Sequence, residues 1–350
     1  MQNVTDRAEQ WLEMKKYKVL VVGAGSAGLI HIENLIALGM EVSVFRYRDK
    51  LKKELSRQSV QKIYDSIEDA LNEKHDAIVI ANRTDQHIAT AISGAKNGAH
   101  LFIEKPLSNK LDGIQELTKI ISQRRLTVEI GCMMRFHPGI KQMKQMLSEG
   151  AIGTPYLARS CVGQFLPEWR PRQDYRESYS AKPAYGGGVL FDLIHELDYL
   201  YWLFGDVLDV SAFTDRISDL KIETEDVANI LLRFKNRISA QIQLDYLSPF
   251  YRRTCEIVGS EGIITWDYMT GEVTLRHKSE SELSIIRQPE SFKRNTMFVD
   301  HMKHFLGVIQ NGGMPAVSLE NGIQVLKIAL AAHRSSKDRL VVRPSDICNN

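Results

Sequence analysis

A short apolar run, Lys18–Val22, leads directly into a glycine-rich string that is followed by a helical pattern. The string has the form GxGxxG, and its residues are Gly23, Ala24, Gly25, Ser26, Ala27 and Gly28. In such a unit the first glycine permits a tight turn, the second lets a pyrophosphate approach the backbone, and the third lets the helix pack on the strand. The helix start then offers free N–H groups and its positive dipole end to phosphates. The string predicts a dinucleotide site, with a purely structural glycine turn as the alternative.

Beyond the glycine string, short apolar runs alternate with helical periodicity as far as about Met134. One helical stretch covers residues 27–38, a second ends at Asn97, and a third ends near Arg124. The apolar runs are Val42–Phe45, Ala77–Ala81, His100–Glu104 and Thr127–Cys132. Strands that alternate with helices form a parallel sheet covered on both faces, because each crossover must return over the sheet. Residues 18–134 are therefore predicted to form a doubly wound α/β domain of the Rossmann type.

The pattern changes in residues 135–350, where strand-like runs follow one another closely. Ile238–Tyr246 alternates apolar residues with Ser239, Gln241 and Gln243, so one face of this strand is expected to be buried and the other polar. The other strand-like runs are Ala228–Phe234, Thr254–Val258, Ile263–Asp267 and Val273–Arg276. The helical segments that close the chain are Phe298–Ile309 and Leu319–Arg334. We expect a second, α+β domain built on a mainly antiparallel sheet.

The length of 350 residues exceeds what one hydrophobic core usually serves, which agrees with two domains. Residues 1–17 are expected to form an N-terminal extension with a short amphipathic helix. Lys and Arg number 45 against 43 Asp and Glu, and this near-balance argues against a nucleic-acid partner. The most apolar stretch, Val19–Ile30, is broken by glycines and is shorter than the roughly 18 residues of a membrane span.

Two further features bear on the compartment. The first residues of the chain lack the apolar core of a signal peptide. The four cysteines lie far apart, without the spacing of a zinc site or the density of a disulfide scaffold. We therefore expect a cytoplasmic protein with neither a membrane partner nor a metal site.

The end of the second strand bears on the choice between NAD and NADP. A NAD site would place an acidic residue there to bind the ribose 2′-OH, about 20 residues beyond the glycines. This chain instead has Arg46 and Arg48, which suit the 2′-phosphate of NADP. NADP is therefore favoured over NAD, although Asp49 can serve a ribose and both arginines can simply point into solvent.

A lysine follows the fifth predicted strand, in the sequence Glu104-Lys105-Pro106. The carboxyl ends of parallel strands form the edge where open α/β sheets bind ligands, so Lys105 is a candidate site residue. Pro106 restricts the backbone here and is compatible with a cis peptide bond. Position alone does not distinguish a functional lysine from a solvated one.

Three glycines, Gly186–Gly188, precede a segment that is predicted to be one helix. On a helix, Asp192 and His195 are three residues apart and share a face with Tyr199. A carboxylate beside an imidazole raises the pKa of the histidine and orients its ring, which suits general acid–base catalysis. The alternative is a hydrogen-bonded pair that only joins two domains.

Taken together, these residues resemble the glucose–fructose oxidoreductase, inositol dehydrogenase and MocA (Gfo/Idh/MocA) family over nearly the whole chain after Lys18. The combination of Glu104-Lys105-Pro106 with the later glycine-led Asp192 and His195 is much more specific than the GxGxxG string alone. The other marks are Ala81-Asn82-Arg83 followed by His87, Met134-Arg135-Phe136-His137-Pro138, and Glu225-Asp226.

The resemblance implies a nicotinamide-binding domain joined to a domain with a large open sheet that mediates assembly into a homodimer or homotetramer. It implies that Lys105 and His195 act at a reacting hydroxyl and that Asp192 supports them. It also places Asn82, Arg83, His87, Glu104 and Lys105 at the cofactor. The expected activity is NAD(P)-dependent hydride transfer to or from a CH–OH or C=O group of a sugar, sugar derivative or polyol.

The substrate side is expected to involve Arg135 and a segment rich in cationic and aromatic residues. That segment contains Trp169, Arg170, Arg172, Tyr175 and Arg176, which can bind a carboxylate or phosphate of the substrate. The alternative is a polar surface loop. The helix around Asp192 and His195 also resembles a subgroup associated with bacterial surface-sugar and nonulosonic-acid gene clusters, which points to nucleotide-sugar or surface-sugar biosynthesis.

The chain departs from the family pattern at two places. The family's usual spacing between the helix aspartate and histidine is four, against three here. The small-residue–Thr–Pro loop after the fourth strand is replaced by Ala81-Asn82-Arg83. Two alternatives to a dehydrogenase remain within this fold. One is a dinucleotide-binding regulator, and the other is a NAD-dependent glycosidase that oxidises its substrate only transiently.

Overall fold

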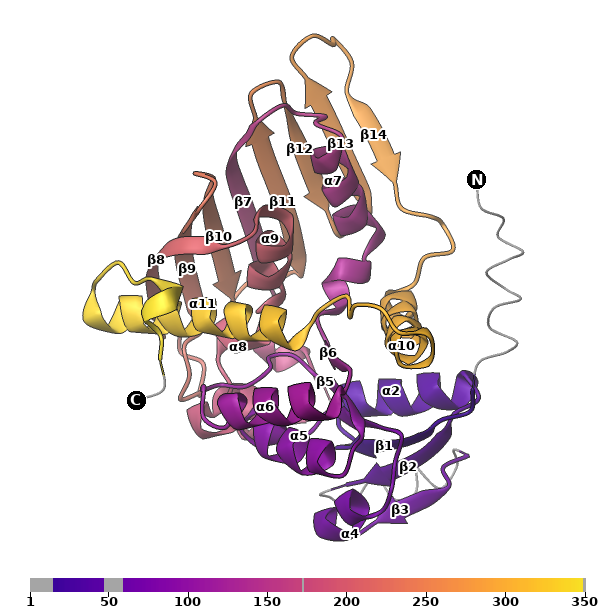
Figure 1. Ribbon diagram of the computed structural model, residues 1–350. Coiled ribbons are helices and arrows are strands. Elements are labelled where there is room, and N and C mark those ends of the chain that lie inside the picture. The colour runs from indigo at the N-terminus through magenta and orange to yellow at the C-terminus, as the bar shows by residue number, and fades with distance from the viewer. Residues whose placement is uncertain (1–14, 47–58, 172, 349–350) are drawn as a thin grey trace.

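The computed structural model describes residues 15–46, 59–171 and 173–348, and these form two sheets with helices between and around them (Figure 1). Residues 1–14 of the predicted N-terminal extension, where its helix is expected, lie outside the described residues, as do Arg48, Asp49 and Arg172. No helix among the described residues is both long enough and apolar enough to span a bilayer.

The first sheet is parallel throughout and has the strand order β3-β2-β1-β4-β5-β6. Its strands are β1 (Lys18–Val22), β2 (Glu41–Phe45), β3 (Lys62–Tyr64), β4 (Ala77–Ile80), β5 (His100–Ile103) and β6 (Val128–Ile130). Its helices are α2 (Ser26–Ala37), α4 (Ile67–Asn72), α5 (His87–Lys96) and α6 (Ile114–Arg124). The order reverses beside β1, and ligands bind at such a reversal in doubly wound sheets. The predicted Rossmann domain is confirmed.

Successive residues of β1 enter two different cores, because side chains alternate across a strand. Val19 and Val21 pack in the core on the side of α2, whereas Leu20 and Val22 pack in the larger core that also receives α5 and α6. All four side chains are at most 1% exposed. A strand buried on both faces reads as a continuous apolar run, which is why β1 and β4 were recognisable in the sequence.

The second sheet has the order β14-β13-β12-β11-β7-β10-β9-β8, and every pairing is antiparallel except that of β7 with β10. Its strands are β7 (Pro155–Gly163), β8 (Val207–Asp215), β9 (Val227–Phe234), β10 (Ser239–Asp245), β11 (Arg252–Gly259), β12 (Gly262–Asp267), β13 (Glu272–His277) and β14 (Ser284–Arg287). The mainly antiparallel sheet is confirmed. Sequence reasoning missed β7, β8 and β14, although β7 lies at the centre of the sheet.

Helices cover one face of this sheet and leave the other open. The helices after β6 are α7 (Pro138–Ser148), α8 (Val189–Asp192), α9 (His195–Phe204), α10 (Arg294–Asn311) and α11 (Leu319–Asp338). Ala240, Ile242 and Leu244 of β10 are buried beneath this layer, as their alternation predicts. The open face forms a shallow hollow lined by polar side chains such as Gln241 and Gln243.

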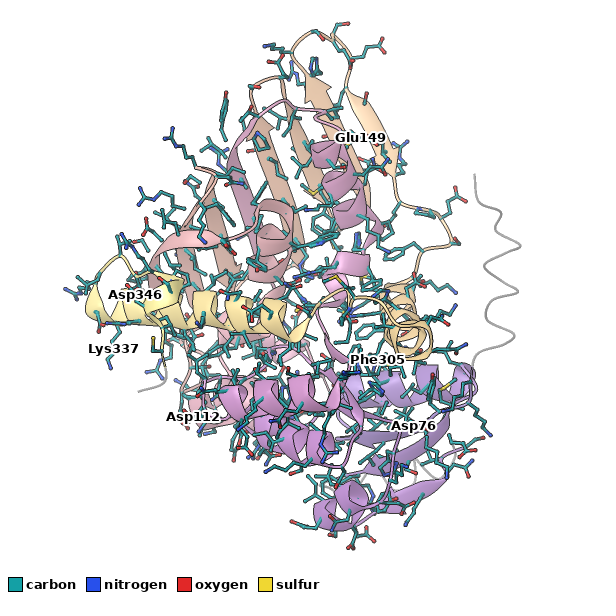
Figure 2. All side chains as sticks on the ribbon, in the orientation of Figure 1. Asp76, Asp112, Glu149, Phe305, Lys337 and Asp346 are labelled. Atoms are coloured by element: carbon teal, nitrogen blue, oxygen red, sulfur yellow. The ribbon has the colours of Figure 1, made fainter. Side chains whose placement is uncertain are left out.

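The helix α10 belongs by its packing to the first domain, although it lies within residues 135–350. Figure 2 labels Phe305 where α10 lies against the first domain, and this side chain is fully buried. Phe305, Met302 and Leu306 share one core with Val19 and Val21 of β1. The chain therefore returns from the second sheet to cover the α2 side of the first.

Candidate active site

The glycine turn after β1 is shaped by close backbone contacts at its first and third glycines. Gly23 has φ of 102°, and a Cβ atom there would lie 2.5 Å from the carbonyl oxygen of Ala81. A Cβ atom on Gly28 would lie 1.9 Å from the carbonyl oxygen of Gly23. Both positions therefore require glycine if β1, β4 and α2 are to pack as they do.

The middle of the same turn is open. Among the described residues, a Cβ atom on Gly25 would meet nothing within 4 Å, and Gly25 is the N-cap of α2 without a capping side chain. The first N–H groups of α2, at the positive end of the helix dipole, therefore have no side-chain cap from the described part of the chain. Nearby, Asn82 Oδ1 is buried without a hydrogen-bond partner among the described residues. An uncapped helix start and an orphaned amide oxygen fit a bound dinucleotide.

The cation at the end of β2 is already engaged by a carboxylate. Arg46 is 5% exposed, and its Nη2 donates a hydrogen bond of 3.1 Å to Asp65 Oδ1, just after β3. Because Asp65 already pairs with this guanidinium, Arg46 gives no preference for a 2′-phosphate over a ribose hydroxyl. The expected preference for NADP is therefore unsupported.

The segment from the end of β4 to the start of α5 contains three residues predicted to bind the cofactor, and two of them, Arg83 and His87, make contacts within the protein. His87 is 1% exposed, and its ring nitrogens lie 2.9 Å from the Pro106 carbonyl oxygen and 3.2 Å from that of Asn82. Burial is the main cause that lowers the pKa of His87. The contact of His87 with the cofactor stays a prediction without support from these contacts, because its ring is enclosed by protein and joins the Asn82 loop to the Pro106 turn.

Arg83 extends toward the second domain. Its guanidinium pairs with Asp85 through hydrogen bonds of 3.1 and 2.9 Å and lies 3.9 Å from the centre of the Tyr185 ring. Tyr185 immediately precedes Gly186. Arg83 therefore anchors the glycine-led segment and does not point a free charge at the dinucleotide.

In the turn after β5, the Glu104 carboxylate contacts α2 of the first domain, and the Lys105 side chain contacts the second domain. Glu104 is 8% exposed, and its Oε1 accepts a hydrogen bond of 2.7 Å from His31 Nε2 of α2. Burial raises the pKa of Glu104, but the His31 hydrogen bond and nearby positive charges outweigh it, so the net pKa is lowered. The charged Glu104 thus ties α2 to β5, while the next residue, Lys105, lies before a cis peptide bond to Pro106.

Lys105 reaches the second domain directly. Its Nζ donates a hydrogen bond of 2.7 Å to the main-chain carbonyl oxygen of Asp192, the last residue of α8. The structure therefore brings Lys105, Asp192 and the start of α9 together at the junction between the domains.

The predicted single helix around Asp192 and His195 is two helices. Leu193, between α8 and α9, has φ of −101° and ψ of 29°, which leaves the helical region. The Asp192 carboxylate accepts a hydrogen bond of 2.6 Å from the Tyr246 hydroxyl through Oδ2, and its Oδ1 has no partner among the described residues. The expected Asp192–His195 pair is therefore wrong, because the helix break turns the carboxylate toward the Tyr246 hydroxyl.

His195 begins α9 in an apolar and cationic surrounding. Its ring is 5% exposed, and Nδ1 has no hydrogen-bond partner in the described part of the chain. Burial first, and then the positive charges of Lys105 and Arg253, hold the pKa of His195 well below its ordinary value of 6.5. A neutral imidazole beside an ammonium group can accept a proton from a hydroxyl.

The predicted role of Arg135 in substrate binding gains no support from its contacts, because its guanidinium is occupied by protein groups. Arg135 is 4% exposed and pairs with the fully buried Asp198 of α9 through hydrogen bonds of 2.7 and 3.0 Å. Its Nη1 also donates to the Ala316 carbonyl oxygen and to Asn321. These contacts occupy the guanidinium and join the segment after β6 to α9 and to the start of α11.

The segment between β7 and α8 adds aromatic residues to this region. The Trp169 ring lies edge-on to Tyr246 at 5.3 Å, and its Nε1 donates to the Gln164 carbonyl oxygen. Tyr175 is half-buried, and its hydroxyl accepts a hydrogen bond of 3.3 Å from the Lys221 amide. Trp169 therefore lies next to the Tyr246–Asp192 pair, whereas the Tyr175 hydroxyl is used in a loop contact.

Sequence reasoning missed several residues that shape the site. Tyr246 follows the last residue of β10, where strand alternation already points it to the buried face, and this was the available signal. Glu196 is buried against Arg253 of β11 at 2.8 Å, directly after His195. No local sequence pattern predicts this ion pair, because Glu196 and Arg253 are 57 residues apart in the chain.

Comparison with known proteins identifies both domains. Residues 17–132 match the model of the oxidoreductase family with an NAD-binding Rossmann fold, and residues 140–265 match the GFO/IDH/MocA C-terminal domain. The chain is 26% identical over 343 residues to myo-inositol 2-dehydrogenase of Thermotoga maritima, covering 94% of this chain and 99% of that protein. It is 23% identical over 344 residues to the NAD(+)-dependent scyllo-inositol 2-dehydrogenase of Bacillus subtilis, covering 92% and 95%.

A solved structure agrees over the full architecture. Levoglucosan dehydrogenase in complex with NADH and levoglucosan superposes with a TM-score of 0.85 at 18% identity, covering 94% of this chain and 99% of that one. That likeness concerns the fold. Because the two family models match the two domains in sequence order and together span more than half of the residues, the chain belongs to the GFO/IDH/MocA family of oxidoreductases.

Proposed function

We propose that this protein is an NAD(P)-dependent dehydrogenase that acts on a CH–OH group of a sugar, sugar derivative or polyol, or reduces the corresponding carbonyl. The observation that carries the proposal is the 2.7 Å hydrogen bond from Lys105 Nζ to the Asp192 carbonyl oxygen. It holds a cation of the dinucleotide domain against the segment that leads into His195. The named functions of the similar inositol dehydrogenases support the same substrate class.

The chain's own residues supply the proton chemistry of this reaction. The nicotinamide, when bound, exchanges a hydride with the substrate carbon. Lys105 binds the reacting oxygen and stabilises the negative charge that develops there. His195 takes the hydroxyl proton during oxidation and returns it during reduction, and its lowered pKa keeps it neutral and ready to accept.

Asp192 is a positioning residue for Lys105. Its backbone carbonyl accepts the Lys105 hydrogen bond, while its carboxylate is held by the buried hydroxyl of Tyr246. Asp192 thus fixes Lys105 with its main chain and is itself fixed from β10. The cofactor would lie along the Gly23–Gly28 turn and the start of α2, next to the orphaned Asn82 amide oxygen.

The test is a cofactor-binding measurement followed by a turnover assay. Titration with NADH and NADPH measures both affinities, and a panel of polyols, sugars and nucleotide sugars is then incubated with NAD+ or NADP+ while reduced nicotinamide is followed by absorbance. A dehydrogenase forms one reduced nicotinamide per carbonyl product. Hydrolysis without net reduction would instead identify a glycosidase, and dinucleotide binding without any turnover would identify a regulator.

We also propose that the open face of the second sheet joins copies of this chain into a homodimer or homotetramer. Phe213 of β8 and Leu231 of β9 are 54% and 51% exposed on this part of the sheet, among polar side chains. Apolar side chains set among polar ones are typical of association surfaces. Light scattering of the wild type and of Leu231→Glu tests this, because the variant is expected to dissociate.

A further inference from the structure

The segment between β7 and α8 has three cations among its described residues, and two of them are paired with carboxylates. Arg176 pairs with Asp174 at 2.5 Å, and Lys182 pairs with Glu223. Arg170 forms no ion pair with any carboxylate of the described residues. Its guanidinium donates a long hydrogen bond of 3.5 Å from Nη1 to Ser180 Oγ and also hydrogen-bonds the Tyr179 phenol, and both partners are uncharged.

Two neighbours of Arg170 connect it to the surroundings of Asp192, the residue whose carbonyl oxygen accepts the Lys105 hydrogen bond. The preceding residue, Trp169, packs on Tyr246, whose hydroxyl donates to Asp192. The guanidinium carbon of Arg170 itself lies 5.1 Å from the centre of the Tyr179 ring. Burial and the negative charge of Asp192 raise the pKa of Tyr179, which agrees with this phenol lying near the end of α8.

The backbone of Tyr179 and Ser180, the two residues that Arg170 contacts, supports the start of α8. The carbonyl oxygen of Ser180 accepts hydrogen bonds from the Gly188 amide and from the Thr224 hydroxyl, and the Tyr179 carbonyl oxygen would lie 2.0 Å from a Cβ atom on Gly187. Arg170 is therefore held at the glycine turn that leads into α8, while Lys105 contacts the other end of that helix.

The chemistry of Arg170 suits an anion. A guanidinium has five N–H donors, and here its hydrogen-bond partners among the described residues, Ser180 and Tyr179, are both neutral. The Tyr179 ring orients the cation but does not neutralise it. Arg170 is half-buried, so an acidic ligand there would be less screened than at the surface. The planar fork binds carboxylate or phosphate oxygens in pairs.

We propose that Arg170 binds an acidic group of the substrate, so that the sugar or polyol oxidised by this protein carries a carboxylate or a phosphate. This inference rests on the proposed dehydrogenase activity and specifies its substrate class. Arg170 is then a specificity-determining residue, and Lys105 and His195 remain the groups at the reacting hydroxyl.

The experiment compares matched sugars that differ in one substituent. D-glucose, D-glucuronate and D-glucose 6-phosphate form one series, and D-galactose, D-galacturonate and D-galactose 6-phosphate form a second. Aldonates and sugar 1-phosphates place the acid at the other end. For each compound, kcat/KM is measured for the wild type, Arg170→Gln, Arg170→Lys and the control Arg176→Gln, which removes a charge that is already paired.

The expected result is a higher kcat/KM for acidic compounds than for their neutral parents, with the carboxylate and phosphate arms showing which acid is used. Arg170→Gln should lower kcat/KM for acidic compounds by about 10- to 100-fold, since a hydrogen bond to a charged group is lost. Arg170→Gln should change kcat/KM for neutral compounds little, and Arg170→Lys should retain part of the preference for acidic compounds. Increasing salt should weaken the acidic preference in the wild type.

Three results would overturn the inference. Equal or better turnover of neutral compounds, or an equal loss for neutral and acidic compounds in Arg170→Gln, would reject the acidic substrate while leaving the dehydrogenase proposal intact. An Arg176→Gln variant with the same selective loss would show that the effect is general electrostatics. If no compound yields reduced nicotinamide, the proposed function itself fails and the inference fails with it.

Discussion

Lys105 Nζ and the main-chain carbonyl oxygen of Asp192 are 2.7 Å apart, and this hydrogen bond crosses from one domain to the other. A side chain from the edge of the parallel sheet thereby meets the helix break that precedes His195. The acceptor is a backbone atom, so substitutions of the Asp192 side chain leave it in place. The position of Lys105 therefore depends on where α8 ends.

Lys105→Ala should lower kcat/KM by about 100- to 1000-fold, because one preorganised donor to the developing charge is lost. The affinity for the dinucleotide should stay nearly unchanged, since the glycine turn and α2 are untouched. Steady-state kinetics and a cofactor titration measure the two effects separately. Lys110→Ala is the control, because Lys110 is exposed and paired with Asp112. Wild-type turnover in Lys105→Ala would reject the assignment of Lys105.

The acid limb of the pH profile for oxidation should lie below pH 6.5. Burial and the charges of Lys105 and Arg253 lower the pKa of His195, so the ring remains an unprotonated base as the pH falls through its ordinary titration range. Measurement of kcat/KM from acidic to alkaline pH at constant ionic strength tests this. In His195→Gln this acid limb should be absent, and kcat/KM should fall by about 100-fold or more. A half-maximal rate above pH 6.5 in the wild type would contradict the assignment of His195.

Tyr246→Phe should destabilise the fold by about 1–3 kcal/mol, because the buried Asp192 carboxylate loses the donor to Oδ2 while Oδ1 has no partner. Turnover should fall as well, since α8 carries the acceptor of Lys105. Urea unfolding and steady-state kinetics provide the two readouts. Ser160→Ala removes the partner of another buried tyrosine, Tyr199, and controls for loss of stability alone. An unchanged free energy of unfolding in Tyr246→Phe would show that the Tyr246 hydroxyl does not stabilise the fold through Asp192.

Glu225 should make the stability of the protein fall between about pH 4.5 and pH 7. Its side chain accepts the Leu190 amide hydrogen bond at the start of α8, and burial, with the charges of Asp192 and Asp226, raises its pKa to about 7. The folded state therefore binds the proton more tightly than the unfolded state, so stability is lost as pH rises through this window.

The shift from 4.5 to about 7 corresponds to a loss of about 3 kcal/mol relative to a variant that cannot ionise. Glu225→Gln is that variant, and its amide oxygen can still accept the Leu190 hydrogen bond. His333 lies 3.9 Å away, so the comparison is repeated in a His333→Gln background. Unfolding free energies of wild type and variant that run parallel across the window would show that Glu225 does not titrate there.

Arg135→Ala should destabilise the protein by about 3–5 kcal/mol, because it leaves Asp198 charged and buried without its partner. The KM of a substrate should hardly change in the fraction that folds. Arg135→Met combined with Asp198→Leu should recover much of the lost stability, since both charges are removed together. A large change in KM without destabilisation would restore Arg135 as a substrate-binding residue.

Local patterns predicted the elements of the first domain well. The glycine turn, β1, α2, β4 and β5 depend on contacts between near neighbours, and strands buried on both faces appear as continuous apolar runs. Strands at the centre of the second sheet were harder to predict from the sequence. β7 carries exposed residues at Tyr156, Leu157 and Arg159, and its pairing partners β10 and β11 lie about 80 or more residues away in sequence.

By itself, the sequence determined the parallel domain, the second antiparallel domain and the presence of Lys105, Asp192 and His195 as chemistry-bearing residues, because these follow from periodicity and short motifs. Only the tertiary structure decided which groups meet. It breaks the helix at Leu193, turns the Asp192 carboxylate to Tyr246, engages Arg46 and Arg135 with carboxylates, and gives Arg170 no carboxylate partner among the described residues. Pairing of buried polar groups depends on segments far apart in the chain, and spacing along the sequence carries no measure of that proximity.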